Sequence, residues 1–433
     1  MMKEKRVKKV KAITLGCKVN AYETEYIMSR FKKAGFLITE ENPDIYIINT
    51  CSVTNTSDAK SRKVINRIIR ENPESIVVVM GCMIEAHRDY SNDGISIMVG
   101  NKDKSRIVEL VNEYIENQEK KKLLYDDFDD YFEDMFIDQM QEHTRAYVKI
   151  QDGCENFCSY CIIPYTRGRQ RSKNPDKVIK EINTLVKNGY KEVVLTGIHT
   201  GHYGSDLDTT FPSLLKRICK IKGLERLRIS SIEVTELDDD FLEVLKNESV
   251  IVNHMHIPLQ AGSDAVLKSM NRKYLTDYFR KKIDTIRKIR PNISISTDII
   301  VGFPGETEEL FRETLEFARE MEFSKIHVFP FSVRHGTVAE TMENQVDENV
   351  KKDRVKRLVA LSNELEQNYL KKFINEVLEV LIETSDSNTS IGHTSNYLKV
   401  RVTKNLPSNT IVKVKIKNLD NLVLEGCVYE ESK

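Results

Sequence analysis

The stretch Cys154-Glu-Asn-Phe-Cys158-Ser-Tyr-Cys161 places three cysteines within eight residues, in the spacing C-x3-C-x2-C. Short loops between ligands cost little closure entropy, so three thiolates at this spacing can face one metal centre. Zinc in a closed structural site takes a fourth protein ligand, usually from a second C-x2-C or an H-x3-H pair, and no such pair follows. Three cysteines instead fit a 4Fe–4S cluster with one iron open to an exogenous ligand.

This run resembles the signature of the radical S-adenosylmethionine (SAM) enzymes. In that family the open iron is chelated by the amino and carboxylate groups of SAM. The resemblance implies that reduction cleaves SAM to a 5′-deoxyadenosyl radical. The alternative interpretation is a chance cluster of reduced cysteines.

The size and composition limit the class of protein. A chain of 433 residues is too long for one compact core, which predicts two or three domains. Lys+Arg and Asp+Glu both number 66, so any basic surface for nucleic acid must be local. The basic start, Met1 to Lys11, lacks the apolar core of a secretory signal, and the longest apolar stretch, Ile76 to Ile84, is too short to span a bilayer. We therefore expect no membrane partner.

Eight cysteines without a signal sequence indicate a reducing cytoplasm and metal ligation rather than disulfides. Six of the eight fall into two groups of three. The other two, Cys219 in a helical pattern and Cys427 in a terminal strand, are interpreted as ordinary buried residues.

The first segment predicts a Rossmann-like, doubly wound parallel sheet. Its strands are expected at Val10–Leu15, Asp44–Ile48 and Ile76–Met80, and its helices at Glu23–Lys33 and Asp58–Arg70. One cysteine follows each strand: Cys17, Cys51 and Cys82. Because sites in such sheets form beyond the carboxyl ends of the strands, we expect the three to converge, although three unrelated turn residues would give the same pattern.

The stretch from Tyr125 to Glu142 holds eight Asp/Glu and neither Lys nor Arg. We interpret it as a flexible acidic linker. Six strand patterns separated by helical patterns follow it, and they predict a partial (β/α)6 barrel with its chemistry at the carboxyl ends of the strands. The strands are expected at Tyr147–Ile150, Val193–Thr196, Leu227–Ser230, His254–Pro258, Ser294–Val301 and His327–Phe331.

The C-terminal part predicts a long charged helix, Asp347 to Phe373, followed by a small β-barrel. In Tyr397–Val402 and Ile411–Lys417 apolar residues alternate with basic or polar ones, so each strand buries one face and exposes bases on the other. This basic face fits an RNA platform, or lysines that keep edge strands from pairing. The expected boundaries are 1–124 for the N-terminal domain, 125–142 for the linker, 143–372 for the core and 373–433 for the barrel.

Taken together, the chain resembles the radical-SAM methylthiotransferases, whose C-terminal barrel is the RNA-binding TRAM module. Within that family it most resembles the bacterial enzymes that act on threonylcarbamoyladenosine in tRNA. The motifs that carry this resemblance are Thr14-Leu-Gly-Cys17-Lys-Val-Asn20, Asn49-Thr-Cys51-Ser-Val-Thr54, Gln151-Asp-Gly-Cys154 and Ile162-Ile-Pro-Tyr165-Thr-Arg-Gly168-Arg169. Cys82-Met-Ile departs from the more usual Cys-Tyr-Ala but keeps the ligand.

The resemblance implies methylthio transfer to carbon 2 of N6-threonylcarbamoyladenosine at position 37 of tRNA, with SAM and two 4Fe–4S clusters as cofactors. Cys154, Cys158 and Cys161 would hold the SAM cluster, and Cys17, Cys51 and Cys82 an auxiliary cluster that carries the donated sulfur. The expected partners are the tRNA anticodon stem-loop and an electron donor such as flavodoxin or ferredoxin; the sulfur source is open. The alternatives are an isopentenyladenosine tRNA or ribosomal-protein aspartate methylthiotransferase, or a zinc-containing RNA-binding protein without enzymatic activity.

Residues at the predicted strand ends are candidates for contact with SAM. Gly197 stands where such proteins approach the SAM amino group with backbone, and a glycine permits that approach. The other candidates are Ser230, Ser231, Gln260, Asp298 and Gly302, although such residues are also common as helix caps and in turns. Arg167, Arg169 and Arg171 suit phosphate or SAM carboxylate binding, although a run of solvated arginines would give the same pattern. The sequence identifies no side chain as a general base, so the catalytic residues remain unassigned.

Overall fold

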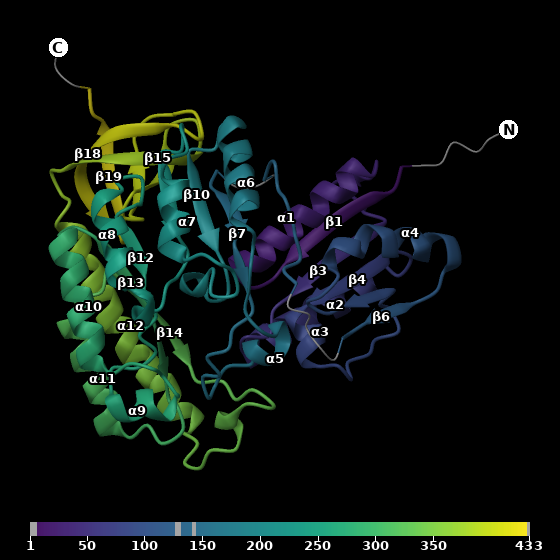
Figure 1. Ribbon diagram of the computed structural model, residues 1–433, viewed down its shortest axis with the longest axis horizontal. Helices are drawn as coiled ribbons and strands as arrows, with labels where there is room; N and C mark the ends of the chain where they lie inside the picture. The colour runs from purple at the N-terminus through teal and green to yellow at the C-terminus, as the bar shows by residue number, and fades with distance from the viewer. Residues whose placement is uncertain (1–6, 126–130, 141–143, 431–433) are drawn as a thin grey trace.

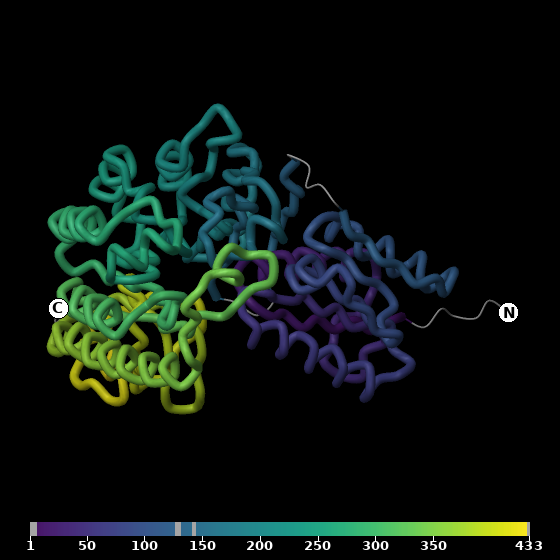
Figure 2. Tube along the Cα trace, turned by 90° about the horizontal axis from the view of Figure 1, so that it is seen from below, coloured from purple at the N-terminus to yellow at the C-terminus, as the bar shows by residue number. Residues whose placement is uncertain are grey.

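The computed structural model describes residues 7–125, 131–140 and 144–430. They form three units in chain order: a parallel α/β sheet, an open β/α barrel and a closed β-barrel. The N-terminal sheet (purple to blue in Figure 1) lies on one side of the open barrel, and helices α10 and α11 lie on the opposite side (Figures 1 and 2).

The N-terminal sheet confirms the expected parallel α/β arrangement and extends it to six strands in the order β2-β1-β3-β4-β5-β6. These strands are β1 (Lys9–Thr14), β2 (Leu37–Ile38), β3 (Ile45–Thr50), β4 (Ile76–Gly81), β5 (Ile97–Val99) and β6 (Lys121–Leu123). All of their pairings are parallel. The sequence did not predict β2, β5 or β6, because strands of two or three residues carry almost no periodicity.

Helices cover both faces of this sheet. They are α1 (Lys18–Lys33), α2 (Asn55–Glu71), α3 (Cys82–Ala86) and α4 (Ile107–Asn117). Successive residues of β3 and β4 alternate between two apolar clusters, one shared with α1 and α4 and the other with α2 and α3. Both strands are buried throughout, as a parallel strand between two helical layers must be.

The middle unit confirms the predicted partial barrel of six strands. The strands are β7 (Ala146–Lys149), β10 (Glu192–Thr196), β11 (Arg226–Ile229), β12 (His254–His256), β13 (Ser294–Val301) and β14 (Lys325–Pro330). They form two three-stranded parallel sheets, β11-β10-β7 and β12-β13-β14, which are joined by a parallel bridge between Leu227 and Ile251. The helices between them are α6 (Pro175–Lys187), α7 (Phe211–Ile218), α8 (Asp239–Asn247), α9 (Asp264–Ser269), α10 (Thr276–Ile289) and α11 (Glu308–Glu320).

The acidic segment is not a flexible tether where the structure describes it. Met135, Ile137 and Met140 are almost completely buried in the same apolar cluster as the barrel strands. The Met135 carbonyl accepts a hydrogen bond from the Tyr22 hydroxyl at 2.5 Å. These three apolar residues pack the segment between α1 and the barrel, despite its acidic net charge. The prediction of a flexible linker was therefore wrong for residues 131–140.

The C-terminal unit follows the long helix α12 (Glu348–Lys371) and is a closed barrel in the order β15-β16-β17-β19-β18. Its strands are β15 (Val377–Ser385), β16 (Ser390–Thr394), β17 (Lys399–Val402), β18 (Ile411–Asp420) and β19 (Val423–Val428). Val400, Val402, Val414 and Ile416 fill the interior, and Lys413 and Lys417 are exposed, as the alternation predicts. Cys219, at the end of α7, and Cys427, in β19, are half-buried rather than buried.

Candidate active site

A cavity of about 1100 Å³ lies where the three units meet. The N-terminal sheet contributes Cys17, Cys51 and Cys82, which we call the N-terminal triad. The open barrel contributes residues that include Thr196, Gly197, Ser230, Ser231 and Asp298, and the C-terminal barrel contributes His393, Tyr397 and Lys399. Residues separated by almost the whole chain therefore border one space.

The N-terminal triad converges as the strand-end rule predicts. β1, β3 and β4 are neighbours in the sheet, and each cysteine directly follows or lies within a few residues of the carboxyl end of its strand. Asn20 ties the loops together, because its side-chain amide donates to the Leu15 carbonyl at 2.7 Å and to the Thr50 carbonyl at 3.0 Å. Cys51 and Cys82 are buried, whereas Cys17 is exposed to the cavity.

Glycine at position 16 is required for this convergence. Gly16 has a φ of +101°, and a Cβ atom there would lie 2.6 Å from Cys51 Cβ and 2.9 Å from Cys51 Sγ. Any larger residue would therefore push the loop that carries Cys17 away from Cys51.

The second group of cysteines, Cys154, Cys158 and Cys161, which we call the core triad, lies in the loop between β8 (Gln151–Asp152) and α5 (Ile163–Arg167). All three are half-buried. The Cys158 sulfur accepts a hydrogen bond from Arg272 at 3.2 Å, and Arg272 also donates to Glu233 at 2.6 Å. The loop is therefore fixed from outside by a guanidinium that neutralises thiolate charge.

The aromatic residues between the core cysteines differ in exposure. Tyr160 packs edge-on against Phe303, with 6.5 Å between the ring centroids. Phe157 is 49% exposed and packs against Tyr165. Only Tyr160 is placed to shield this loop from water.

The donor set of both triads fits an iron–sulfur cluster better than one metal ion. Four thiolates around a single zinc at about 2.3 Å would lie about 3.8 Å from one another. Among the described residues, neither triad brings its three sulfurs within 4.8 Å of one another, whereas His199, His202 and Glu236 do meet that spacing with their ligand atoms. Burial raises the pKa of Cys51 to about 11 and that of Cys161 to about 12, which favours the neutral thiol over the thiolate unless a cation lies beside it.

The loop after β10 lies between the cavity and the core triad. Gly197 lines the cavity, and a Cβ atom there would lie 2.9 Å from Gln151 Oε1 and 3.1 Å from Gln151 Cβ, so a larger residue would require Gln151 to move. Two residues later, His199 Nδ1 lies 3.9 Å from Cys154 Sγ. One short loop thus borders the cavity on one side and contacts the core triad on the other.

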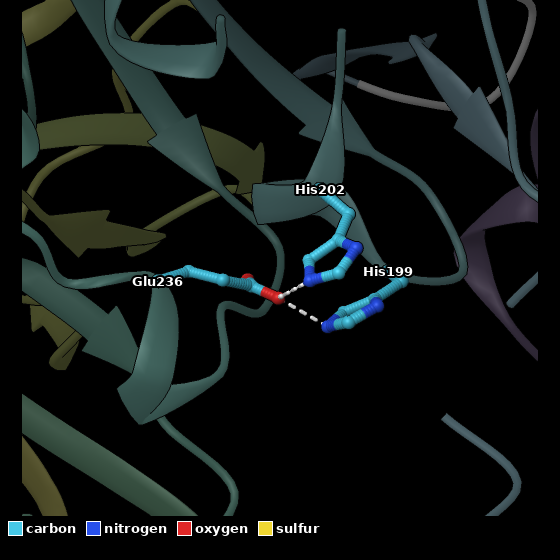
Figure 3. Close-up of side chains that lie close together, drawn as sticks. All are labelled: His199, His202 and Glu236. Atoms are coloured by element: carbon cyan, nitrogen blue, oxygen red, sulfur yellow. Dashed lines mark ion pairs between the residues drawn. The ribbon is translucent and has the colours of Figure 1, made fainter. Parts of the chain in front are cut away.

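His199, His202 and Glu236 form a compact group beside the core triad (Figure 3). The two imidazole rings stack with 4.1 Å between their centroids, and both face the Glu236 carboxylate. Burial opposes protonation of His199, but its hydrogen bonds to Cys154 and Glu236 outweigh burial and raise its pKa to about 10. The sequence analysis missed this group, although its H-x2-H spacing after a barrel strand was a visible signal.

The candidate SAM residues divide into two sets. Ser230, Ser231 and Asp298 line the cavity, and Asp298 lies 3.2 Å from His256 Nε2. Gln260 and Gly302 are not among the lining residues. Both have positive φ, of 68° and 74°. The Gln260 backbone pairs with β13, because its N–H donates to the Asp298 carbonyl and its carbonyl accepts from Ile300, and the Gly302 N–H donates to the Glu306 carboxylate. Their contact with SAM remains a prediction.

A buried ionic network joins the N-terminal sheet to the core loop. The Glu23 carboxylate, on α1, pairs with Lys104, with Lys149 at 2.9 Å and with Arg167 at 3.0 Å. Arg167 also donates to Asp152 at 3.0 Å and is 1% exposed. The prediction that Arg167 binds a phosphate or the SAM carboxylate was wrong, because its guanidinium is already paired with the carboxylates of Glu23 and Asp152.

A basic end of the cavity adjoins the C-terminal barrel. The guanidiniums of Arg145 and Arg228 lie 5.0 Å and 4.6 Å from the centroid of the Tyr397 ring. Lys18, directly after Cys17, lines the cavity. Burial, together with Arg228 and Arg145, lowers the pKa of Lys18 to about 8.

Among the helices that the structure describes, none is both long enough and apolar enough to cross a membrane.

Comparisons with known proteins agree with this architecture. Residues 148–318 match the Radical SAM superfamily, and residues 9–100 match the uncharacterized protein family UPF0004. Among solved structures, the radical SAM methyltransferase TsrM from Kitasatospora setae, with cobalamin and a 4Fe–4S cluster bound, aligns with a TM-score of 0.56 at 13% identity over 77% of each chain. At that identity the likeness concerns the fold alone.

Curated relatives match over nearly the full length. The threonylcarbamoyladenosine tRNA methylthiotransferase MtaB of Bacillus subtilis (strain 168) is 46% identical over 93% of this chain and 92% of its own. The enzyme of the same name from Chlamydia pneumoniae is 36% identical over 97% of both chains. A tRNA-2-methylthio-N(6)-dimethylallyladenosine synthase of Clostridium botulinum (strain Langeland / NCTC 10281 / Type F) is 35% identical over 95% of both. The chain therefore belongs to the radical-SAM methylthiotransferase family.

Proposed function

We propose that this protein adds a methylthio group to carbon 2 of N6-threonylcarbamoyladenosine at position 37 of tRNA. The observation that carries the proposal is the 46% identity, over 93% of the chain, to an enzyme named for that substrate. The N-terminal triad lines the cavity, and the loop that carries Gly197 in the cavity wall also brings His199 Nδ1 to 3.9 Å from Cys154 Sγ of the core triad. This arrangement supports the two-cluster chemistry that the reaction requires.

In this proposal the core triad holds the cluster that binds SAM, and the N-terminal triad holds the auxiliary cluster. When bound, the clusters and SAM supply the radical, the sulfur and the methyl group. Gly197, Ser230, Ser231 and Asp298 line the cavity and are our candidates for contact with SAM. Gln260 and Gly302 remain weaker candidates.

The protein itself orients the reactants and excludes water. The Glu23 network fixes the N-terminal triad relative to the core loop, because Arg167 bonds to Asn20 at 2.8 Å on one side and to Asp152 at 3.0 Å on the other. Arg334, which follows β14 of the open barrel, forms a second link to the N-terminal unit. It pairs with Asp58 at 2.7 Å and donates to Ser52, next to Cys51. Such fixed distances favour transfer between two centres, because the reacting groups are already oriented.

The proposed partners follow from the surface and the chemistry. The basic strand face of the C-terminal barrel would contact tRNA phosphates near the anticodon stem-loop. A small electron carrier such as flavodoxin or ferredoxin would reduce the core cluster, and the sulfur source is left open. Cysteine usage supports action in a reducing cytoplasm.

The test is a nucleoside analysis of tRNA from cells that lack the protein. We expect N6-threonylcarbamoyladenosine to persist and its 2-methylthio form to disappear, and to return when the wild-type gene is restored but not the variant Cys158→Ala. Loss of the methylthio form of isopentenyladenosine instead would assign the other tRNA substrate. Colourless protein after anaerobic preparation would favour the zinc-containing RNA-binding alternative, since two 4Fe–4S clusters give about eight irons per chain.

A further inference from the structure

The cations at the basic end of the cavity differ in whether a carboxylate pairs with them directly. Arg228 pairs with Glu192 at 2.6 Å, and Arg145 lies 3.3 Å from Glu383. Within the part of the chain that the structure describes, the Lys18 ammonium forms neither an ion pair within 4.0 Å nor a hydrogen bond. Lys18 is half-buried in the cavity wall, and an ammonium group that has lost part of its hydration without a direct counter-ion is stabilised when an anion binds beside it.

The position of Lys18 links this charge to the reacting centre. Lys18 is the first residue of α1 and directly follows Cys17, and both line the cavity. Any substrate atom that reaches the N-terminal triad therefore lies close to the backbone of Lys18. Its neighbours at this end are aromatic: Tyr397 lies 4.9 Å from His393 and 5.2 Å from His254, centroid to centroid. Aromatic rings of this kind offer a surface on which a base can stack.

We propose that Lys18 binds the carboxylate of the threonylcarbamoyl group and thereby selects this substrate over an adenosine with an uncharged N6 substituent. The inference depends on the proposed function. Carbon 2 and N6 lie on the same edge of adenine, so a base with carbon 2 toward the N-terminal triad carries its N6 substituent toward the same residues. A lysine ammonium supplies the compact positive charge that a carboxylate on a flexible side chain requires.

Other anions at this position are outcomes of the test. A tRNA phosphate would be bound regardless of the N6 substituent, and binding would then be insensitive to the threonyl carboxylate. The SAM carboxylate would make loss of Lys18 abolish SAM cleavage as well as product formation. The three anions therefore predict different results.

The experiment compares two anticodon stem-loops that differ only in charge, one with the free threonyl carboxylate and one with its methyl ester. Wild-type holoenzyme, Lys18→Gln, Lys18→Arg and the control Lys32→Gln are assayed for methylthiolated product and for 5′-deoxyadenosine. Lys32 is exposed in the last turn of α1, so its variant removes the same charge from the same helix outside the cavity.

We expect wild type and Lys32→Gln to prefer the acid over the ester by about 10- to 100-fold in kcat/KM, the scale of a partly buried charge pair. In Lys18→Gln this preference should fall to about threefold or less, with SAM cleavage and iron content retained, and Lys18→Arg should restore most of it. Equal use of acid and ester by wild type, or an undiminished preference in Lys18→Gln, would overturn the inference while leaving the proposed function intact. The wild-type comparison needs no variant, so it holds even if Lys18→Gln loses iron. Failure of wild type to modify the acid at all would instead refute the proposed function.

Discussion

Replacing Glu23 with glutamine should destabilise the joint between the N-terminal sheet and the core loop. The Glu23 side chain is 1% exposed, and its carboxylate serves three cations: Lys104, Lys149 and Arg167. Glutamine keeps the shape but removes the charge, which leaves Asp152 as the carboxylate that neutralises Lys149 and Arg167. Removing one partner of a buried ion pair lowers the free energy of unfolding by about 3–5 kcal/mol.

That cost is large compared with the marginal stability of a domain, roughly 5–15 kcal/mol. For a cooperative unit of about 150–250 residues it lowers Tm by roughly 6–20 °C. The measurement is anaerobic scanning calorimetry of the reconstituted holoenzyme. The control is Glu71→Gln, whose carboxylate is 53% exposed and pairs with Arg70 on the surface, a pair worth at most about 1 kcal/mol. A Glu23→Gln variant that melts within about 1 °C of wild type would refute the structural role of the network.

The same network predicts a pH dependence. Burial raises the pKa of Glu23, but Arg167, Lys104 and Lys149 outweigh it and hold the pKa well below its ordinary value. A lowered folded pKa contributes stability above the unfolded value of about 4.3 and loses it as the pH falls toward the folded value. The difference in stability between wild type and Glu23→Gln should therefore be constant above about pH 5 and shrink below about pH 4. A difference that instead shrinks between pH 6 and 8 would contradict this assignment.

Three further predictions concern the clusters and the RNA surface. Cys158→Ala should abolish reductive SAM cleavage, and persistent 5′-deoxyadenosine formation would contradict the role of the core triad. Changing the whole N-terminal triad to alanine should halve the iron, to about four per chain, and retain SAM cleavage without methylthiolated product; full iron with product would refute the two-cluster account. Replacing Lys413, Lys415 and Lys417 together with glutamine should weaken tRNA binding and flatten its salt dependence by up to about 0.9 for each phosphate that is no longer neutralised, and an unchanged slope would favour solvated edge lysines.

The placement of the two cysteine triads could be predicted from the sequence because it follows from strand order and local spacing. Cys17, Cys51 and Cys82 lie more than thirty residues apart, yet each follows a recognisable buried strand, and neighbouring parallel strands deliver their ends to one edge. The core triad could be predicted from its C-x3-C-x2-C spacing alone. Both inferences need only patterns that the sequence displays, namely three buried strands in succession and one C-x3-C-x2-C spacing.

What could not be predicted depends on contacts between distant segments. Arg167 resembles an anion-binding residue in the sequence, and only the fold shows that Glu23, over 140 positions earlier, neutralises it. Met135 and Ile137 lie in an acidic stretch whose net charge suggests solvent, although both are fully buried. Lys18 and Tyr397 line the same cavity although they lie near opposite ends of the chain. No hydrophobic periodicity in the sequence predicts that these two residues are close.

The central claim is tested most directly by reconstitution in vitro. Anaerobically prepared holoenzyme, a chemical reductant, SAM with a labelled methyl group and an anticodon stem-loop containing N6-threonylcarbamoyladenosine are combined, and the nucleosides are analysed by mass spectrometry. The account predicts one labelled methylthio group at carbon 2 of that nucleoside, and its absence when isopentenyladenosine replaces it. Label on isopentenyladenosine alone, or 5′-deoxyadenosine without any modified nucleoside, would contradict the account.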